Sequence, residues 1–360
     1  MSLRVLYGIQ GTGNGHLARA RSLLPALRGA NIEVDCLFSG RDPADFFDMA
    51  VFGEFRCVKG FTLVVDRGRL KLPATLYRNS ILRFVREVAA LQLDKYDLVI
   101  SDFEPVSAWA ARLRGKPCIG ISNQNAFHYA VPKVKGYAAS RLLMRCFAPV
   151  DKALGFHWHH FNQPVLPPLI EPHANKPAIE RKILIYMGFE DLDDIRKFLE
   201  PHSAFQFYVF ARVSASEDHG HLHIRPLSHT EFHHHLEDCS GVISNAGFEL
   251  ASECLALGKK LLVKPIHGQY EQLSNALALQ VLKRATVIES LDQQALARWL
   301  QLPAHSPMHY PDVGKAIANW LAQGQQESVA ELASSLWSKH AIACEYEADC
   351  GDEIVPNLDY

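Results

Sequence analysis

Short apolar segments alternate with amphipathic segments throughout the first half of this 360-residue chain. Asp97–Ser101 is apolar between turn signals and too short for a helix, as is typical of a strand in a parallel sheet covered on both faces. Leu3–Tyr7 and Ile32–Phe38 are similar short runs, and the helical segment Leu17–Leu27 lies between them. Because crossovers between parallel strands are right-handed, this alternation predicts an α/β fold with a doubly wound sheet.

The pattern begins again after a proline-rich interval. Residues 161–180 hold five prolines and no helical period, so we expect an extended linker there. Strand-like runs then return with Lys182–Met187, and the length of the chain suits two domains. We therefore predict one Rossmann-like domain over residues 1–160, a second over residues 181–325, a closing helix over residues 326–345 and a loosely held acidic tail over residues 346–360.

Charge and composition exclude several classes of protein. Lys and Arg number 37 against 39 Asp and Glu, and this balance leaves no basic field for general binding to nucleic acid. The sequence contains no run of about 18 uncharged apolar residues and no signal-peptide cleavage pattern, so we expect a cytoplasmic protein. The eight cysteines are widely spaced without a C-x-x-C pair, which argues against a zinc ribbon or a disulfide framework.

A glycine-rich loop, Gly8-Ile-Gln-Gly-Thr-Gly-Asn-Gly-His16, joins the first predicted strand to the first helix. Backbone N–H groups at this position face the crevice beyond the strand ends and can bind an anionic or polar ligand. A dinucleotide fingerprint would need a third glycine where His16 stands, and a turn needed only for tight packing is the other alternative. Gly13, Asn14 and Gly15 are therefore candidate ligand-binding residues.

His16 stands at the predicted start of the first helix, where the helix dipole favours a neutral imidazole with a lone pair free for a proton. Asp102 ends another strand, and the carboxyl ends of parallel strands lie at the same edge of the sheet. A carboxylate that holds one ring nitrogen and stabilises the imidazolium would make His16 a general base. Asp102 could equally be the cap or turn residue of the helix that follows it.

The most informative segment lies in the second half and reads strand, glycine turn, helix, strand, proline loop and helix. Gly247 lets a ligand approach the N-terminus of the first of these helices, whose free N–H groups suit a diphosphate. Glu249 and Glu253 lie four residues apart on one helical face, and a carboxylate one turn into a helix can accept hydrogen bonds from a ribose diol. Glu271 and Gln272 open the next helix, where they could contact sugar hydroxyls.

Three motifs give the chain a resemblance to a known family: G-T-G-x-G-H near the N-terminus, S-x-x-G-x-x-x-x-x-E in the second half and P-x-x-x-x-x-[DE]-Q-x-x-N-A after it. In these motifs and their order the sequence resembles the GT-B glycosyltransferases that use nucleotide-sugar donors. The nearest likenesses are the bacterial N-acetylglucosaminyltransferase that forms lipid II and the glucuronosyl- and plant glycosyltransferases. The resemblance extends in patches over residues 3–283, and it implies two Rossmann-like domains facing across a cleft, the first for the acceptor and the second for the nucleotide sugar.

The resemblance also implies a reaction and a site. A metal-independent, inverting hexosyltransferase would pass a sugar from a nucleotide-diphosphate sugar, by default a UDP-sugar, to an acceptor hydroxyl in cell-envelope or glycoconjugate biosynthesis. His16 and Asp102 match the base and its partner, the backbone at Gly247 the diphosphate contact, and Glu253 the ribose contact. The full donor-binding set expected on these grounds is Gly13, Asn14, Gly15, Leu227, Ser228, Gly247, Phe248, Glu249, Glu253, Glu271 and Gln272.

Glu249 and Leu250 depart from the family pattern, in which a hydroxyl or amide often stands near the phosphates. An ionised carboxylate repels a diphosphate unless it is turned away or paired with a cation. This departure leaves open an unusual donor, a Glu249 that serves the acceptor side, or a degenerate site in a non-catalytic nucleotide-sugar-binding subunit. A UDP-sugar 2-epimerase-like isomerase on the same fold, with Glu104 and Glu249 as available acids and bases, is a further alternative.

No cofactor and no metal site are predicted. Histidines cluster around residues 157–160 and 219–235, but His233, His234 and His235 follow one another in a predicted helix and should splay around its axis. Asp191 and Asp193 begin another helix, where acids complement the helix dipole.

The expected partners are a nucleotide-sugar donor and an acceptor of unknown identity, either lipid-linked or a glycan, and no nucleic acid is expected. The basic and apolar segment over residues 133–145 could bring the protein into peripheral contact with the inner face of the membrane. A solvated helix face with one buried side is the simpler interpretation of that segment.

Overall fold

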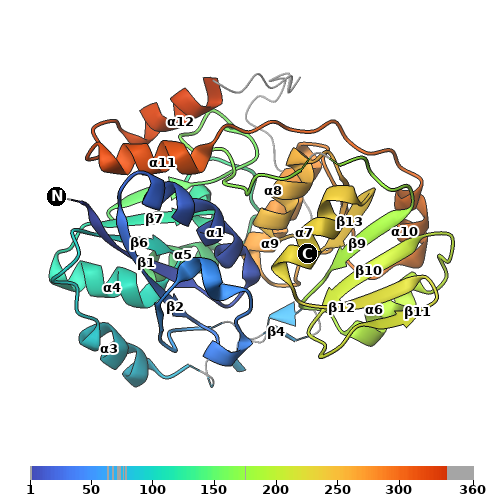
Figure 1. Cartoon of the computed structure of the whole chain (residues 1–360), viewed down its shortest axis with the longest axis horizontal. Helices are drawn as coiled ribbons and strands as arrows, with labels where there is room; N and C mark the ends of the chain where they lie inside the picture. The colour runs from blue at the N-terminus through green and yellow to red at the C-terminus, as the bar shows by residue number, and fades with distance from the viewer. Residues whose placement is uncertain are drawn as a thin grey trace.

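Residues 2–62, 65–66, 69–70, 74–75, 77, 79–174 and 176–338 are described in this computed structural model. The predicted acidic tail and the last residues of the predicted closing helix lie outside the described residues. Two α/β units, each built around its own large sheet, lie side by side, and the C-terminal helices return to the first unit (Figure 1).

The first unit contains a six-stranded sheet in the order β3-β2-β1-β6-β7-β8, in which every neighbouring pair is parallel. Its strands are β1 (Arg4–Gln10), β2 (Glu33–Ser39), β3 (Phe55–Cys57), β6 (Leu98–Asp102), β7 (Cys118–Ser122) and β8 (Lys152–Gly155). Its helices are α1 (Asn14–Gly29), α3 (Ile81–Ala90), α4 (Pro105–Arg114) and α5 (Ala138–Phe147). A separate two-stranded antiparallel sheet joins β4 (Val65–Asp66) and β5 (Arg69–Leu70).

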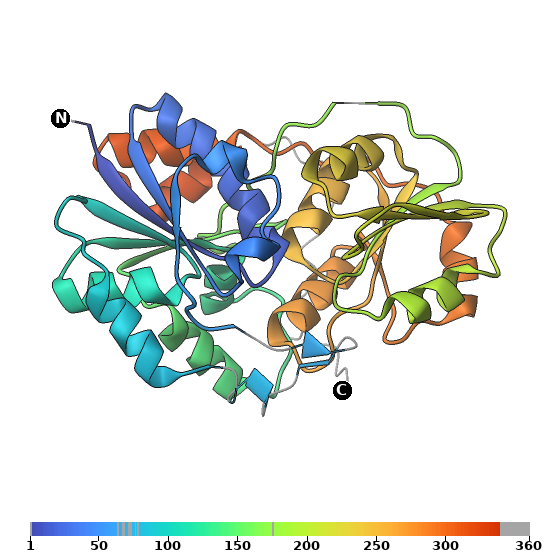
Figure 2. The same ribbon diagram turned by 60° about the horizontal axis from the view of Figure 1, so that its bottom comes forward.

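Helices cover both faces of this sheet (Figure 2). On β1, Val5, Tyr7 and Ile9 belong to the core under α1, whereas Leu6 belongs to the core under α3 and α4. The two C-terminal helices, α11 (Val313–Ala322) and α12 (Val329–Ser338), pack on the same side as α1. The buried strands are apolar on both faces for this reason.

The second unit contains a seven-stranded sheet in the order β11-β12-β10-β9-β13-β14-β15, which is parallel except for the pair β11–β12. Its strands are β9 (Lys182–Tyr186), β10 (Gln206–Ala211), β11 (Glu217–His219), β12 (Leu222–Pro226), β13 (Gly241–Ser244), β14 (Lys260–Val263) and β15 (Thr286–Val287). Its helices are α6 (Leu192–Leu199), α7 (His229–Asp238), α8 (Phe248–Ala256), α9 (Tyr270–Val281) and α10 (Gln293–Leu300).

In both sheets the first strand lies near the centre, and the side on which later strands are added reverses beside it. The reversal falls between β1 and β6 in the first sheet and between β9 and β13 in the second. In such sheets ligands bind beyond the carboxyl ends of the strands at the point of reversal. The prediction of two doubly wound α/β units is confirmed, and the topology directs attention to the loops that follow these four strands.

Several elements were not predicted from the sequence, among them β8, β12, α10 and α11. The change from one sheet to the other occurs between Gly155 and Lys182, across the predicted linker. Residues 1–160 and 181–325 remain our proposed limits of the two domains, and α11, within the second range, packs on α1 of the first unit. Asp191 caps α6 as expected, since its carboxylate accepts hydrogen bonds from the N–H groups of Asp193 and Asp194. Among the described helices none has both the length and the apolar character needed to cross a lipid bilayer.

Candidate functional site

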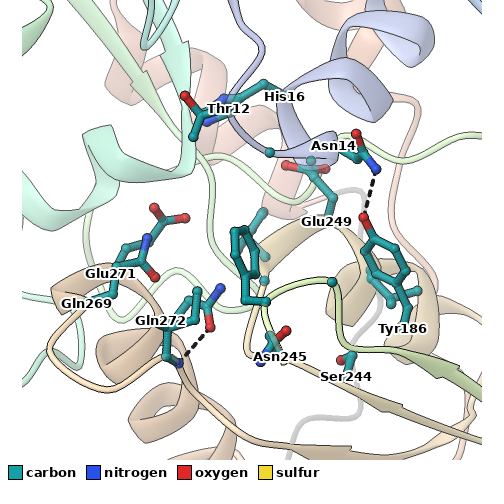
Figure 3. Close-up of a pocket in the computed structure, with 18 of the residues that line it drawn as sticks. Thr12, Asn14, His16, Tyr186, Ser244, Asn245, Glu249, Gln269, Glu271 and Gln272 are labelled. Carbon is teal, nitrogen blue, oxygen red and sulfur yellow. Dashed lines mark hydrogen bonds between the residues drawn. The ribbon is translucent and has the colours of Figure 1, made fainter. Parts of the chain in front are cut away.

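A cavity of about 500 Å³ lies where the carboxyl ends of the two sheets face each other. Its volume suits a small-molecule ligand. Figure 3 shows polar side chains that reach it from both units, including His16 on α1 and Glu249 on α8. Residues that line it include Gly13, Asn14, Gly15, His16, Arg19, Arg41, Asn123, Gln124, Tyr186, Arg212, Leu227, Ser244, Asn245, Gly247, Phe248, Glu249, Leu250, Glu271 and Gln272.

His16 and Asp102 form the predicted pair. The distance from His16 Nδ1 to Asp102 Oδ1 is 2.7 Å, and the Asp102 side chain is fully buried. Asp102 also accepts a hydrogen bond from a guanidinium, so we treat it as an ionised acceptor and place the proton on His16 Nδ1. This tautomer leaves Nε2 with its lone pair. Asp102 is not the cap of α4, because the carboxylate of Glu104 accepts hydrogen bonds from the N–H groups of Val106 and Ser107.

Arg19 joins this pair to the second unit. It lies three residues after His16 on α1, its side chain is 1% exposed, and its Nη1 donates to Asp102. Its Nε donates to Glu249 Oε1 at 2.9 Å, and its Nη2 donates to the same oxygen and to Asn123. Burial alone would lower the pKa of Arg19, but the charges of Asp102 and Glu249 raise it above its usual value, so the guanidinium stays charged. Burial raises the pKa of Glu249 to about 7, and the charge of Arg19 opposes this rise, so Glu249 is paired with a buried cation.

Two glycines open the space between the units. A Cβ on Gly15 would approach Glu249 Cγ to 3.3 Å, so the start of α1 lies close against α8. Gly247 is the N-cap of α8 and provides no side-chain cap, and a Cβ added there would meet nothing within 4 Å. The first N–H groups of α8 thus lack a side-chain acceptor beside the cavity, a setting that suits an anion.

Glu271 and Gln272 line the cavity but already have partners within the protein. Glu271 accepts hydrogen bonds from Asn123 Nδ2 at 3.0 Å and from Gln124 Nε2 at 2.9 Å. Gln272 Oε1 accepts one from the Ile266 N–H at 2.9 Å. A donor sugar would have to exchange with these contacts or use the remaining atoms.

Glu253 and Ser228 do not line the main cavity. They line a smaller one of about 90 Å³, which shares Asn14, Tyr186 and Leu227 with the main cavity. Ser228 is the N-cap of α7, and its hydroxyl accepts a hydrogen bond from the Glu231 N–H. Asn14 Nδ2 donates to the Tyr186 hydroxyl at 2.7 Å across the two units (Figure 3). The expected donor residues are therefore divided between two neighbouring cavities.

Over the described residues, the main cavity is lined by arginines without an acidic partner and by polar atoms without a hydrogen-bond partner, which suits a polar anionic ligand. Arg41 and Arg212 both line the main cavity, and within the described part of the chain neither forms a salt bridge. Burial lowers the pKa of Arg41, as does the nearby charge of Arg212. Six lining residues carry buried side-chain atoms without a hydrogen-bond partner among the described residues: Asn14, Arg41, Gln124, Ser244, Asn245 and Gln269. Buried polar groups normally have hydrogen-bond partners, and a ligand bound in the cavity would supply the partners that these atoms lack.

Among the described residues, histidine and glutamate side chains come together in two groups of the kind that can hold a metal ion. One consists of Glu171, His229 and His233, and the other of His173, His233 and Glu253. The consecutive histidines of α7 do splay as expected, because His233 lies beside Glu253 whereas His234 lies beside Lys176. Convergence comes instead from separate segments, which a reading along the sequence could not reveal.

Sequence reasoning missed Arg19, Arg41, Tyr186 and Arg212. Arg19 was detectable in part, since a residue three positions after His16 lies on the same helical face. Arg41 and Arg212 follow the ends of β2 and β10, so their position at the carboxyl edge of each sheet was a further signal.

Comparison with known proteins gives one family and one fold. The family model "Glycosyl transferase family 1" matches residues 3–303. The glycosyltransferase SnogD from Streptomyces nogalater is 16% identical, with 94% of this chain and 100% of that chain covered and a TM-score of 0.52. The glycosyltransferase SsfS6 from Streptomyces sp. SF2575, complexed with thymidine diphosphate, is 14% identical, with 93% and 99% covered and a TM-score of 0.58.

A third structure, the spinosyn rhamnosyltransferase SpnG complexed with thymidine diphosphate, is 16% identical, with 93% and 100% covered and a TM-score of 0.54. No curated protein matches the sequence. At these identities the three structures establish the two-domain fold, and the family model covers most of the chain. The chain therefore belongs to glycosyl transferase family 1 and is a glycosyltransferase of the GT-B type.

Proposed function

We propose that this protein transfers a hexose from a nucleotide-diphosphate sugar to an acceptor hydroxyl with inversion, and that His16 is the general base. The observation that carries the proposal is the meeting of the His16–Asp102 pair with the uncapped N-terminus of α8 at one cavity. In this proposal the first unit presents the acceptor and the second binds the donor. The resemblance of the motifs favours UDP, and the thymidine diphosphate bound by SsfS6 and SpnG makes TDP the other nucleotide to test.

The proposed step balances in its bonds and protons. The acceptor oxygen forms a bond to the anomeric carbon as the bond from that carbon to the diphosphate oxygen breaks. The hydroxyl proton moves to His16 Nε2, and Asp102 stabilises the imidazolium through Nδ1–H. The nucleoside diphosphate leaves with its electron pair, and the N–H groups of α8 together with Arg41 and Arg212 offset its growing negative charge.

The pairing of Glu249 removes the main reason for a degenerate site. With Arg19 beside it, this carboxylate need not repel a diphosphate. The isomerase alternative needs Glu104 and Glu249 as its acid and base. Glu104 is not available for this role, because it is fully buried and caps α4 with both carboxylate oxygens. Neither alternative gains support from the site.

Replacing Arg41 or Arg212 with glutamine is expected to weaken binding of a nucleoside diphosphate by roughly tenfold each. A hydrogen bond to a charged group contributes about 1.5–3 kcal/mol, and each 1.4 kcal/mol is a tenfold change in affinity. Isothermal titration with UDP and TDP measures the change. Arg298→Gln, on the exposed surface of α10, is the matched control and should bind as the wild type does. Equal affinities in all four proteins would contradict the assigned role of these cations.

The acceptor side of the cavity is apolar, and we propose an acceptor that carries an apolar part. Phe103, Leu143, Met144 and Phe147 line the cavity together with His16, and the Phe103 and Phe147 rings stack with centroids 4.9 Å apart. Leu143 is also 61% exposed on α5, so this apolar wall continues to the surface. Transfer to a detergent-solubilised lipid-linked hydroxyl, compared with a water-soluble glycan, tests this, and co-sedimentation with vesicles tests contact with a membrane. Preference for the glycan would contradict it.

Product analysis distinguishes the proposed function from its alternatives. The protein is incubated with UDP-hexoses and TDP-hexoses, with and without acceptors, and released nucleotide and sugar-nucleotides are separated. Transfer predicts nucleoside diphosphate release that depends on the acceptor, and a glycoside of anomeric configuration opposite to that of the donor. A C2-epimerised sugar-nucleotide formed without acceptor would show an isomerase, and a product that keeps the donor configuration would contradict inversion.

A further inference from the structure

Three segments bring two histidines and a glutamate together beside the smaller cavity. His173 comes from the chain between the two sheets, His233 from α7 and Glu253 from α8. Glu253 Oε1 lies 3.3 Å from His233 Nε2 and 3.7 Å from His173 Nε2. The two imidazole rings stack with centroids 5.2 Å apart. One donor atom from each of the three residues lies within 4.8 Å of the others.

The orientation of His233 is the one that metal-binding histidines adopt. Its Nδ1 lies 2.8 Å from the backbone oxygen of His229, so Nδ1–H donates to that carbonyl and Nε2 points to Glu253. A backbone carbonyl that accepts a hydrogen bond from the other ring nitrogen fixes the tautomer and the direction of the ring. His229 is held in turn by Glu171, whose carboxylate oxygen lies 3.2 Å from His229 Nε2.

His173 supplies an independent observation. Its side chain is 5% exposed, and Nε2 has no hydrogen-bond partner in the part of the chain that the structure describes. A buried ring nitrogen without a partner lacks the contact that such groups normally have. The same atom faces Glu253 from outside hydrogen-bonding distance, so an ion between the two would satisfy it.

We propose that His173, His233 and Glu253 bind a divalent transition metal, with Zn²⁺ as the ion that best fits two imidazoles and one carboxylate. Three protein ligands leave a fourth position, and the smaller cavity lined by His233 and Glu253 adjoins it and can supply water. Ligation of the ion by His233 Nε2 requires this nitrogen to be free of a proton, so binding of the ion is coupled to pH. The bound ion fastens the chain between the sheets to α7 and α8.

The histidines of the cluster at residues 157–160 do not offer this arrangement. Near the start of the same connecting chain, the Nδ1 atoms of His157, His159 and His160 each accept a hydrogen bond from a backbone N–H one or two residues later. These three belong to local turns. The donors of the proposed site come from segments that lie far apart in the sequence. Glu253 is 20 residues after His233 and 80 residues after His173.

A consequence for the donor rests on the proposed function. If Glu253 contacts the donor ribose, it cannot do so fully while it ligates a metal. Zn²⁺ should then lower the affinity for a nucleoside diphosphate, and the metal site would regulate the transferase without taking part in catalysis.

The test uses the untagged, metal-free protein and Zn²⁺ alone, measured by isothermal titration and by competition with a coloured chelator. We expect one tight site in the wild type. His173→Gln and His233→Gln should each weaken it by roughly 100-fold or more, because loss of a ligand costs at least as much as loss of a supporting partner. His234→Gln, the exposed neighbour on α7, is the matched control and should bind as the wild type does.

Several outcomes overturn the proposal. These are the absence of a tight site in the wild type, equal affinity in all four proteins, and equal loss in His234→Gln. Circular dichroism and thermal unfolding check that each variant is folded, and His173→Gln should still bind UDP or TDP if either is the donor nucleotide. If the wild-type protein binds Zn²⁺ tightly but binds no nucleotide, the metal site is upheld and only the proposed function is contradicted.

Discussion

Replacing His16 with alanine is expected to lower kcat by about 100-fold to 10,000-fold and to leave the affinity for the donor nucleotide unchanged. A positioned general base contributes about that much to a proton transfer. His16 Nε2 is the free nitrogen of a ring that Asp102 holds through Nδ1, and His16 lines the cavity on the acceptor side. Initial rates with saturating donor, together with titration of the nucleotide, separate the two effects.

The matched control is His234→Ala, an exposed histidine on α7. It should keep wild-type kcat and wild-type binding of the donor nucleotide. A His16→Ala protein that turns over at the wild-type rate would remove the base assignment. One that loses nucleotide binding would instead place His16 on the donor.

Replacing Arg19 with methionine is expected to lower the free energy of unfolding by about 3–5 kcal/mol. Removal of one partner from a buried ion pair leaves uncompensated charge in the interior. Here both Asp102 and Glu249 lose their cation, and in the described structure the remaining side-chain partner of Asp102 is His16, through its hydrogen bond. The substitution keeps most of the length of the side chain, so lost packing contributes little.

Urea denaturation measures this effect, and Arg298→Met on the surface of α10 is the control, with an expected change within about 0.5 kcal/mol. Adding Glu249→Gln to Arg19→Met should restore part of the lost stability, because Glu249, whose pKa burial already raises to about 7 beside Arg19, otherwise has to stay charged or take up a proton at a cost in stability. Equal stability of Arg19→Met and the wild type would show that this cation does not hold the two units together.

The fold was largely predictable because its signals are local. The predicted strand Asp97–Ser101 corresponds to β6, Leu98–Asp102, which is buried throughout, and α1 begins at Asn14 within the glycine-rich segment. β12 was missed because its histidine and arginine mask a period-two alternation of buried and partly exposed residues, Leu-His-Ile-Arg. β8 has only four residues and a lysine at its start, too little for a periodic signal.

The candidate site was predictable where it depends on sheet topology and not where it depends on how the two units pack. Asp102 is the last residue of β6, and His16 lies in the first turn of the helix that follows the neighbouring strand β1, so their closeness is a property of one sheet. The pairing of Arg19 with Glu249 spans 230 residues and two units. No periodicity along the chain encodes such a contact, and the convergence of His173, His233 and Glu253 was hidden for the same reason.

Thermal unfolding with and without nucleotides tests the central claim, that the N-terminus of α8 binds the diphosphate of the donor. UDP, TDP, GDP, CMP and NAD are compared at about millimolar concentration with the wild type, Gly247→Val and the control Gly29→Ala. A Cβ at either glycine meets nothing within 4 Å, so both variants should fold, but only the valine enters the cavity beside α8.

A ligand at about 100 times its Kd stabilises a protein by roughly 2.7 kcal/mol, enough to raise Tm by a few degrees. The account predicts that one nucleoside diphosphate raises the Tm of the wild type and of Gly29→Ala but not that of Gly247→Val. A Tm that rises only with NAD, or one that rises equally in Gly247→Val, would contradict it.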